Sequence, residues 1–444
     1  MSRTSQFAEA IREGRVDRDL EAVYPATYPE ERPRLAALAG ELGRHFDGGP
    51  IHLFSAPGRT ELGGNHTDHN AGRVLAASVS LDTVAAVCAR DDDLVEVVSE
   101  GYEGLIRVDL GVLEPDEREH GRPQALIRGV AAYLHTAGYV AGGFSAVVTS
   151  RVGSGSGLSS SAAFEVLIAE IFSVLYNGGR LPAVELALAG RHAENRYFGK
   201  PSGLMDQIAC ATGGVIAIDF RKEDEPLVER IPVNFHDHGY QLFAVDSGED
   251  HADLTDDYAA IVAEMAAVAR PLGADRLREV DYGEFRRRIP ELRAEAGDRA
   301  VLRALHFFRE NERVLRQSRM LGDGDIEGFL AEVGESGRSS WRFLQNCYSP
   351  AGPRRQGIAV ALALSEEFLE RPDRFAHPPR LEGATRVHGG GFAGTIQTYV
   401  PLARAAEYRE SMAAVFGPAA VTELSVRETG VCRITDSRTA GATD

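Results

Sequence analysis

Residues 59–70, with the sequence RTELGGNHTDHN, gather side chains that can bind a small polar ligand. They include one arginine, two histidines, two carboxylates and two carboxamides around a pair of glycines. Glycine lets the backbone turn sharply, so several of these groups can converge on one molecule that is rich in hydroxyl groups. Strand-like runs at 51–54 and 74–79 flank the segment. The pattern favours a binding turn between two strands, and the alternative is an ordinary solvated loop.

A second segment, residues 153–162, has the sequence GSGSGLSSSA and directly precedes an apolar helical pattern. The backbone N–H groups of Gly155 and Gly157 can approach phosphate oxygens, and the dipole of the following helix adds to the attraction. The hydroxyl groups that can reach a phosphate or a bound Mg²⁺ are those of Ser159, Ser160 and Ser161. Because no lysine follows the last glycine, this is not a Walker loop, and Leu158 replaces the final glycine of the dinucleotide fingerprint. The helix that follows favours a phosphate-binding loop over a flexible linker.

Together these motifs resemble those of the GHMP small-molecule kinases, and within them those of the galactokinases. The first segment, with Gly58, is similar to the galactokinase signature GRxNxIGEHTDYN, and the second is similar to the PxGxGLSSSA loop of the family. Two further segments agree: residues 203–207 (GLMDQ) are similar to GIMDQ, and residues 389–394 (GGGFAG) are similar to GGGFGG. Order and spacing match from about Phe46 to Ile434. Each motif alone would be a weak signal, whereas all of them in the right order are a specific one.

The resemblance assigns the chemistry of phosphoryl transfer to Asp206 and Arg59. The aspartate would accept the proton of a sugar's anomeric hydroxyl as that oxygen attacks the γ-phosphorus of ATP. The arginine would keep Asp206 ionised and would neutralise charge on the transferring group. The alternative is a structural ion pair, and whether the aspartate acts as a base or as a positioning group stays open.

By the same resemblance, Glu194 would bind Mg²⁺ with Ser161 as its partner. A cation that bridges the β- and γ-phosphates of ATP needs carboxylate or hydroxyl oxygens, and Glu194 stands twelve residues before Asp206. The alternative is a glutamate on the solvent-facing side of a helix.

The resemblance also predicts which residues bind the sugar. His66 and Asp68 would form hydrogen bonds with its hydroxyl groups, and Gly203 would present its backbone to the ring. Tyr258 falls where these kinases carry a tyrosine that contacts the sugar. Residues 259–261 (AAI) replace the basic residues that usually follow, so a core position in a helix explains Tyr258 equally well.

The chain departs from the signature at Asn65, where the family has glutamate, and at Glu61, where it has asparagine. By resemblance, that glutamate accepts a hydrogen bond from the C6 hydroxyl of galactose, and Asn65 can accept the same bond. Asparagine would also tolerate a carboxylate at C6, so with Arg73 nearby a uronic acid such as galacturonate becomes a candidate substrate. Alternatively, Glu61 reaches the place of the missing glutamate from four positions away.

The composition is that of a globular protein, with 444 residues of which 43% are hydrophobic and 26% charged. The formal net charge of −18 disfavours nucleic acid and anionic membranes as partners. Four cysteines stand far apart in the sequence, which fits a reducing cytoplasm better than a disulfide framework. The first fifteen residues lack the apolar core of a signal peptide, and no apolar run has the length of a membrane span. We expect a cytoplasmic protein whose partners are a sugar and ATP.

Hydrophobic periodicity predicts strands and helices without a regular βαβ alternation, which favours an α+β fold. Chain length and a charged, proline-bearing stretch at 222–226 predict two domains, residues 1–222 and 223–444. The resemblance implies the two-domain GHMP-kinase fold, with the active site in the cleft between the domains. The predicted helices are 6–12, 34–46, 123–135, 160–175, 183–198, 254–272, 300–320, 326–345, 355–368 and 403–416. The predicted strands beyond the signature are 84–87, 95–98, 144–149, 215–220, 242–245, 395–400 and 421–434.

We therefore expect a sugar-1-kinase that transfers the γ-phosphoryl group of MgATP to the anomeric hydroxyl of a hexose, with galactose as the leading substrate. A kinase for galacturonate or another modified galactose is the alternative among enzymes. A paralogue that binds sugar and ATP without catalysis is the alternative from another class. Such a paralogue should have lost the base, the magnesium ligand or the serine run, and this chain has all three.

Overall fold

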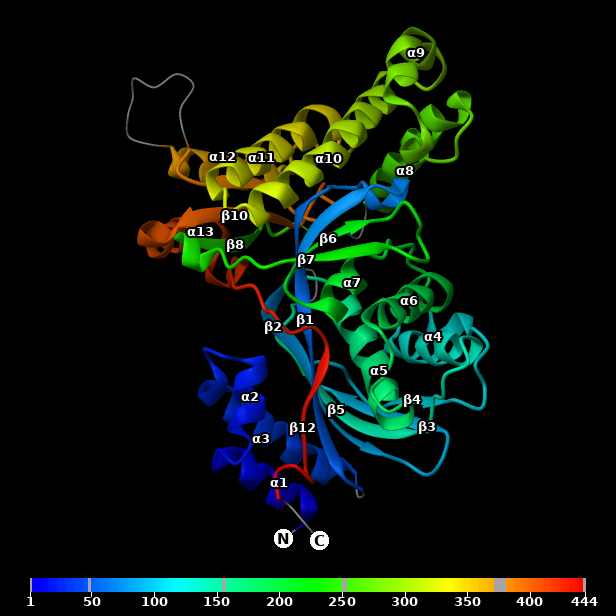
Figure 1. The fold of residues 1–444 in the computed structure, drawn as a ribbon, viewed down its shortest axis with the longest axis vertical. Coiled ribbons are helices and arrows are strands. Elements are labelled where there is room, and N and C mark those ends of the chain that lie inside the picture. Colours follow the sequence, from blue (N-terminus) through cyan, green and yellow to red (C-terminus); the bar gives the residue numbers. More distant parts are fainter. Residues whose placement is uncertain (1, 47–48, 154–156, 250–253, 371–380, 442–444) are drawn as a thin grey trace.

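The computed structural model describes residues 2–46, 49–153, 157–249, 254–370 and 381–441. Among these residues, eight strands form a large sheet in the order β12–β1–β2–β5–β3–β4, with β6 paired to β2 and β7 paired to β6 (Figure 1). Its neighbouring strands are antiparallel apart from the parallel pair β3 and β5. The strands are β1 (Ile51–Gly63), β2 (Arg73–Ala89), β3 (Leu94–Ser99), β4 (Ile106–Asp109), β5 (Phe144–Ser150), β6 (Val215–Asp219), β7 (Leu227–Ile231) and β12 (Cys432–Asp436).

Helices cover both faces of this sheet (Figure 1). One face carries α4 (Pro123–Thr136), α5 (Ser160–Tyr176), α6 (Ala183–Ala193) and α7 (Met205–Thr212), and the other carries α1 (Arg3–Arg12), α2 (Asp17–Val23) and α3 (Tyr28–His45). Successive residues of β2 divide between the two faces: Val84 and Ala86 pack with the N-terminal helices, whereas Ala85 and Val87 pack with α4 and α5. Because both faces are covered, β1 and β2 are almost continuously buried.

A smaller antiparallel sheet, formed by four of the described strands, has the order β11–β8–β10–β9. Its strands are β8 (Tyr240–Asp246), β9 (Ala384–Val387), β10 (Thr395–Pro401) and β11 (Val421–Leu424). Helices α11 and α12 pack against β9, and α13 packs against β8. The long α10 packs against α11 and contacts β1 and β2, so α10 and α11 together link the two sheets. The helices of this half are α8 (Thr255–Ala269), α9 (Tyr282–Glu295), α10 (Asp298–Gly322), α11 (Ile326–Ser339), α12 (Gly357–Leu369) and α13 (Ala405–Phe416).

The α+β prediction is confirmed, but some boundaries differ. Residues 421–434, predicted as one strand, form β11 and β12 in different sheets. The first residues of the signature, predicted as a turn, complete strand β1, and the turn itself covers residues 64–72. Helix α9 was not predicted, since its arginine-rich sequence buries only Phe285 and Leu292. The domain boundary predicted after residue 222 does not separate the sheets, because β7 and β12 follow it and both join the large sheet.

Asp82 on β2 joins the N-terminal helices to the sheet and to the C-terminal part of the chain. Its buried carboxylate accepts hydrogen bonds from Tyr24 Oη (2.6 Å) and Ser55 Oγ (2.5 Å). It also pairs with Arg34 on α3 and with Arg427, whose Nη1 lies 3.3 Å from Oδ2. Burial raises the pKa of Asp82, but the charges of Arg34 and Arg427 outweigh that effect and hold the pKa below its usual range.

We expect Asp82→Asn to lower the free energy of unfolding by about 3–5 kcal/mol at pH 7, because buried Arg427 loses its counter-charge and Arg34 keeps only Glu31. The pKa of Asp82 is lower in the folded protein than in the unfolded chain, where it is about 3.9. The stabilisation from Asp82 is therefore fully present above the unfolded pKa and is lost as the pH falls through the folded pKa. The deficit of the variant should therefore shrink in acid. Urea unfolding at pH 7 and below pH 4 measures both effects, with the exposed Asp91→Asn as control. Equal stability of the two variants at pH 7 would contradict this account.

Candidate active site

A cavity of about 690 Å³, a volume typical of ligand pockets, lies where the large sheet and its helices meet the β9–β10 turn. The side of the large sheet contributes Arg59 from β1, the first turn of α5, and Asp206 from α7. The side of the small sheet contributes the β9–β10 turn with His388 and Gly390. One part of the lining is apolar and consists of Tyr102, Ile106, Leu126, Phe164 and Phe198. Segments that are far apart in the sequence, including all the glycine-rich motifs, thus meet at one cavity.

Arg59 and Asp206 form a bidentate ion pair in this cavity. Arg59 Nε lies 2.6 Å from Oδ1 and Nη2 lies 2.7 Å from Oδ2. Ser159 Oγ also donates to Oδ2, and Arg59 Nη1 donates to the carbonyl of Gly157. Burial raises the pKa of Asp206, but the charge of Arg59 and these hydrogen bonds outweigh it, so the pKa lies below its usual range. Since the Asp206 side chain is 31% exposed and that of Arg59 only 7%, the ionised carboxylate can receive a proton from a bound hydroxyl.

The structure describes Gly153 and residues 157–162 of the phosphate loop, and Gly155 lies outside the described residues. Gly157 has a φ of +74° and packs against the small sheet. A Cβ at this position would collide with the Thr395 hydroxyl and would lie 3.1 Å from His388 Nδ1. Only glycine fits both the backbone conformation and this close approach.

The serine run begins helix α5. Ser159 is its N-cap residue and has a left-handed backbone, with φ 60° and ψ 63°. Such a conformation costs a non-glycine residue about 1–3 kcal/mol and is concentrated at functional sites. Ser160 and Ser161 occupy the first turn of the helix and line the cavity. The N-terminus of a long helix therefore faces the cavity, as a phosphate site requires.

Glu194 is buried, so its alternative interpretation as a solvent-facing helix glutamate is wrong. Its side chain is 2% exposed. Oε1 accepts hydrogen bonds from Ser161 Oγ (3.0 Å) and Lys200 Nζ (2.7 Å), and Oε2 accepts one from Gln207 (3.1 Å). A carboxylate beside a hydroxyl suits Mg²⁺, which binds hard oxygen ligands and usually keeps waters and substrate phosphates. In the described part of the chain no group of three His, Cys, Asp or Glu side chains forms a metal cage.

Two residues of this site, Lys200 and Glu165, were not predicted from the sequence. Burial lowers the pKa of Lys200, but the charge of Glu194 outweighs this and raises it. Burial, followed by the charge of Glu194, raises the pKa of Glu165 well above its usual range. Gln207 Nε2 bridges the two glutamates, at 3.0 Å from Glu165 and 3.1 Å from Glu194. Lys200 lies six residues from both Glu194 and Asp206, and this spacing could have indicated a site residue. Nothing near Glu165 in the sequence indicates that it belongs to the site.

His66, predicted to bind the sugar, contacts the glycine loop that precedes β10. Its Nε2 lies 2.8 Å from the carbonyl of Gly390, which can only accept, so Nε2 carries the proton. Burial, followed by the charge of His69, lowers the pKa of His66 to about 3. The neutral ring therefore retains Nδ1 as a hydrogen-bond acceptor for a ligand.

Like His66, the predicted sugar-binding residues Asp68, Gly203 and Tyr258 do not line the cavity. A Cβ on Gly203 would collide with the Asp68 carboxylate, so these two residues are in contact. Tyr258 Oη donates to the carbonyl of Gly391 (2.8 Å), and its ring packs edge-on against Phe392 at 5.5 Å. In this structure Tyr258 thus supports the glycine loop.

Asn65 does not face the cavity, because its side chain is completely buried. Its Nδ2 donates to the carbonyl of Gly389 (2.7 Å) and to Glu61 Oε1 (3.1 Å). Its Oδ1 accepts from Asn346 (2.9 Å) and Ser340 (3.3 Å). The hydrogen-bonding capacity of the amide is therefore used within the protein.

The two charged residues that could have compensated for Asn65 are also engaged. Glu61 forms a buried ion pair with Arg386 from β9, and their side chains are 4% and 0% exposed. Burial raises the pKa of Glu61, and Arg386 offsets only part of that effect. Arg73 pairs with Asp219 (2.9 Å) and Glu312 (3.4 Å), which do not line this cavity.

Known proteins match the chain over most of its length. Residues 43–89 match the galactokinase galactose-binding signature, and residues 125–214 match the N-terminal domain of GHMP kinases. The galactokinase of Streptomyces coelicolor is 32% identical over 374 residues, which cover 83% of this chain and 90% of the relative. That of Actinobacillus pleuropneumoniae serotype 5b is 30% identical over 380 residues, which cover 84% and 91%.

Solved structures of kinases have a similar fold. The galactokinase of Lactococcus lactis, crystallised with galactose, has a TM-score of 0.76 and 22% identity over 90% of this chain and 100% of that one. The mevalonate kinase of Methanococcus jannaschii has a TM-score of 0.55 and 14% sequence identity, and the match covers 85% of this chain and 99% of that one. Fold and site together define a GHMP small-molecule kinase. Identity of about 30% along nearly the whole length of its relatives narrows this further: the chain belongs to the galactokinase family of ATP-dependent sugar kinases.

We expect Asn65→Glu to lower the free energy of unfolding by about 3–5 kcal/mol, because it places a second carboxylate beside buried Glu61 without a cation of its own. Urea unfolding measures this, with His69→Glu as control, since that side chain on the same turn is 32% exposed. The exchange variant Glu61→Asn/Asn65→Glu, which restores a single carboxylate, should recover part of the loss. If Asn65→Glu is as stable as the wild type, position 65 faces the cavity instead.

Proposed function

We propose that this protein transfers the γ-phosphoryl group of ATP to the anomeric hydroxyl of galactose, giving galactose 1-phosphate. The observation that carries the proposal is the bidentate Arg59–Asp206 pair, which lines the same cavity as the serine run. Galactokinases at 30% and 32% identity support galactose as the sugar. Nucleotide and sugar would meet in this cavity between two domains, residues 1–222 and 223–444, where β7 and β12 of the second join the large sheet of the first.

In the proposed reaction, Asp206 accepts the proton of the sugar O1 as that oxygen attacks the γ-phosphorus. Its pKa lies below the usual range, so it is ionised at neutral pH but is a weak base. Much of its effect should therefore come from orienting the hydroxyl for a loose, dissociative transfer. Arg59 remains charged and lies beside both Asp206 and Gly157 of the phosphate loop, where it would neutralise charge on the transferring group.

We further propose that Glu194 and Ser161 hold Mg²⁺ together with ATP. When bound, the ion neutralises the β- and γ-phosphates and orients them for in-line transfer. Lys200 and Gln207 hold the carboxylate of Glu194 in place. The raised pKa of Glu165 disfavours a second negative charge behind Glu194.

The alternatives have less support. A galacturonate kinase would need a free amide at Asn65 or a cation from Arg73, and both side chains are engaged elsewhere. A non-catalytic paralogue would not need Asp206, Glu194 and the serine run together.

The cytoplasm is the proposed compartment, which the four free cysteines support. Among the described helices none is both long and apolar enough to cross a membrane.

An ADP-release assay with MgATP and galactose, galacturonate, glucose, N-acetylgalactosamine or no sugar tests the proposed function. We expect turnover to be highest with galactose, and Asp206→Asn to lower kcat by about 10²–10⁴-fold with little change in ATP affinity. Asp224→Asn, at a side chain that is 89% exposed, is the control. Turnover that is independent of Asp206, or highest with galacturonate, would overturn the proposal.

The proposed magnesium site is tested by Glu194→Gln, which keeps the shape of the side chain and removes its charge. We expect the Mg²⁺ concentration for half-maximal activity to rise at least tenfold, because the only carboxylate ligand proposed here is lost. The shift in melting temperature caused by Mg²⁺ with a non-hydrolysable ATP analogue should shrink in parallel. Glu225→Gln, at a side chain that is 78% exposed, is the control. An unchanged Mg²⁺ requirement would remove Glu194 from the site.

A further inference from the structure

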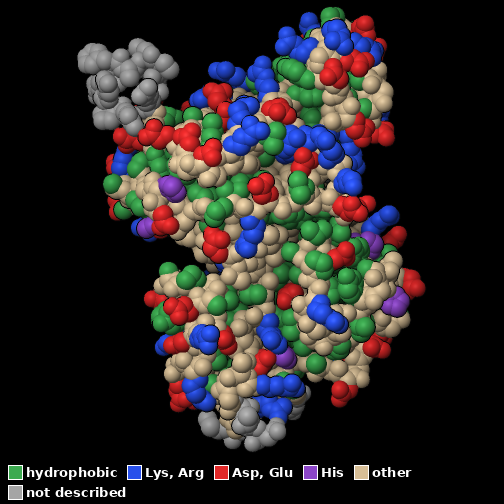
Figure 2. All heavy atoms as spheres, in the orientation of Figure 1, with side chains coloured by type: hydrophobic (Ala, Val, Ile, Leu, Met, Phe, Trp, Pro, Cys, Tyr) green, Lys and Arg blue, Asp and Glu red, His purple; other side chains and the backbone are tan. Residues whose placement is uncertain are grey.

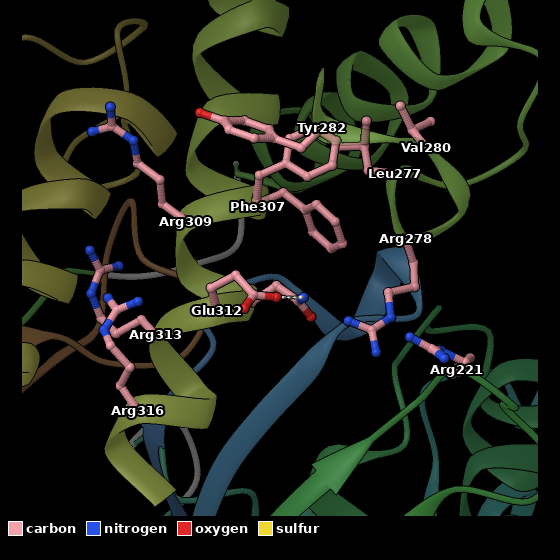
Figure 3. Close-up of a pocket in the computed structure, with 12 residues that line it drawn as sticks. Arg221, Leu277, Arg278, Val280, Tyr282, Phe307, Arg309, Glu312, Arg313 and Arg316 are labelled. Atoms are coloured by element: carbon pink, nitrogen blue, oxygen red, sulfur yellow. Dashed lines mark hydrogen bonds between the residues drawn. The ribbon is translucent and has the colours of Figure 1, made fainter. Parts of the chain in front are cut away.

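A second cavity, of about 530 Å³, shares no lining residue with the active-site cavity. Its walls are helix α10, the segment that leads into α9, and Arg221 just after β6 (Figure 3). Figure 3 shows arginines on two sides, with aromatic rings between and above them. We call it the arginine pocket, after the arginines that line it: Arg221, Arg278, Arg309, Arg313 and Arg316.

The charge of this pocket is opposite to that of the chain. The chain has a formal net charge of −18, yet five arginines and a single carboxylate, Glu312, line the pocket. Figure 2 shows Lys and Arg side chains gathered over α10 and beneath α9. Like charges repel, so carboxylate partners or a bound anion would stabilise such a cluster.

Arg278 lacks a full set of partners although its side chain is only 7% exposed. Its Nη2 lies 2.8 Å from Asp219 Oδ2, but the same oxygen lies 2.9 Å from Arg73 Nε. Its Nε is buried, and no hydrogen-bond partner for it is found among the described residues. Burial lowers the pKa of Arg278, and the charges of Arg73 and Arg221 lower it further, against the effect of Asp219. Arg278 therefore shares one carboxylate oxygen with Arg73, and part of the positive charge of the pocket wall lacks a counter-charge.

The other arginines are of two kinds. Arg313 and Arg316 are fixed by Glu332, with Nε–Oε distances of 3.1 and 2.8 Å. For Arg221 and Arg309, no carboxylate of a described residue lies within ion-pairing distance, and both are exposed. Arg309 instead lies over the ring of Phe343, at 4.8 Å. The pocket thus combines arginines that carboxylates hold in place with two exposed arginines that have no carboxylate partner among the described residues.

Aromatic rings form the remaining wall. Tyr282 is 39% exposed and lies 5.1 Å from Phe308, with Phe307 behind them. Arginines bind phosphate oxygens through paired N–H donors, and an exposed aromatic ring binds a flat base by stacking. A phosphate alone would leave the aromatic wall unused, and an apolar ligand would leave the arginines unpaired.

We propose that the arginine pocket binds a nucleoside diphosphate, with its phosphates on Arg221, Arg278 and Arg309 and its base on Tyr282. The cavity volume lies in the range of small-molecule sites. This binding is separate from catalysis, and its test does not depend on the proposed sugar or on turnover.

Isothermal titration with GDP at low ionic strength tests the proposal. The wild type and the Arg221→Met/Arg309→Met variant have the same catalytic cavity, so any difference between them reports the arginine pocket. We expect GDP to bind at least tenfold more weakly to the double variant, and added salt to weaken wild-type binding. Arg319→Met, on the same helix but outside the pocket, should bind like the wild type. Both altered residues are exposed, so the double variant should fold normally.

Pyrophosphate and Tyr282→Leu test the part played by the base. We expect pyrophosphate to bind the wild type at least tenfold more weakly than GDP, and Tyr282→Leu to weaken GDP but not pyrophosphate. Equal affinity of the wild type and the double variant for GDP would overturn the pocket as an anion site. Pyrophosphate binding as tight as that of GDP would overturn the nucleotide as its ligand.

Discussion

The buried ion pair between Glu61 and Arg386 fixes the geometry on which the rest of the site depends, because it joins the end of β1 to β9 across two sheets. Moving both charges out of water costs several kcal/mol per ion, so such a pair persists only where its geometry is fixed and further hydrogen bonds support it. Asn65 supplies one of them to Glu61 and binds the carbonyl of Gly389 with the same amide nitrogen. The polar residues of the signature therefore lie in two environments. Asn65 and Glu61 bind residues of the β9–β10 segment and connect the two sheets, whereas Arg59 lines the cavity.

His388 extends this constraint to the phosphate loop. Burial lowers its pKa well below the usual range, so the ring is neutral. The backbone N–H of Glu61 donates to Nε2 (3.1 Å), which places the ring proton on Nδ1, and Nδ1 donates to Thr395 (3.1 Å). Gly157 packs against Thr395 so closely that a side chain there would collide. The loop at Gly157, the Arg59–Asp206 pair and the glycine turn thus share one rigid frame, as the proposed in-line transfer would require.

Periodicity was sufficient to predict most helices and the α+β class, because it is a local signal. The meeting of Arg59 with Asp206 was predicted from the resemblance to a known family. The sequence was insufficient where a partner is distant in the chain. Nothing near Asn65 indicates that Gly389 and Asn346 would use its amide, and nothing near Arg73 indicates Asp219. The return of β12 to the large sheet was missed for the same reason, since strand pairing is set by contacts across hundreds of residues. Glu165 and Lys200 were missed because a pKa depends on burial and neighbours that only the fold supplies.

Helix α10 connects this frame to the arginine pocket. On one side, Glu310 accepts a hydrogen bond from the backbone of Gly64 (3.2 Å), and Asn311 accepts one from the backbone of Arg73 (3.0 Å), so the helix holds both ends of the signature turn. On the other side it carries Arg309 and Arg316 into the pocket. Arg73, one candidate for recognising a sugar carboxylate, is drawn by Asp219 and Glu312 to the pocket side of the turn. The charge arrangement that weakens the galacturonate hypothesis is thus the same one that leaves Arg278 short of partners.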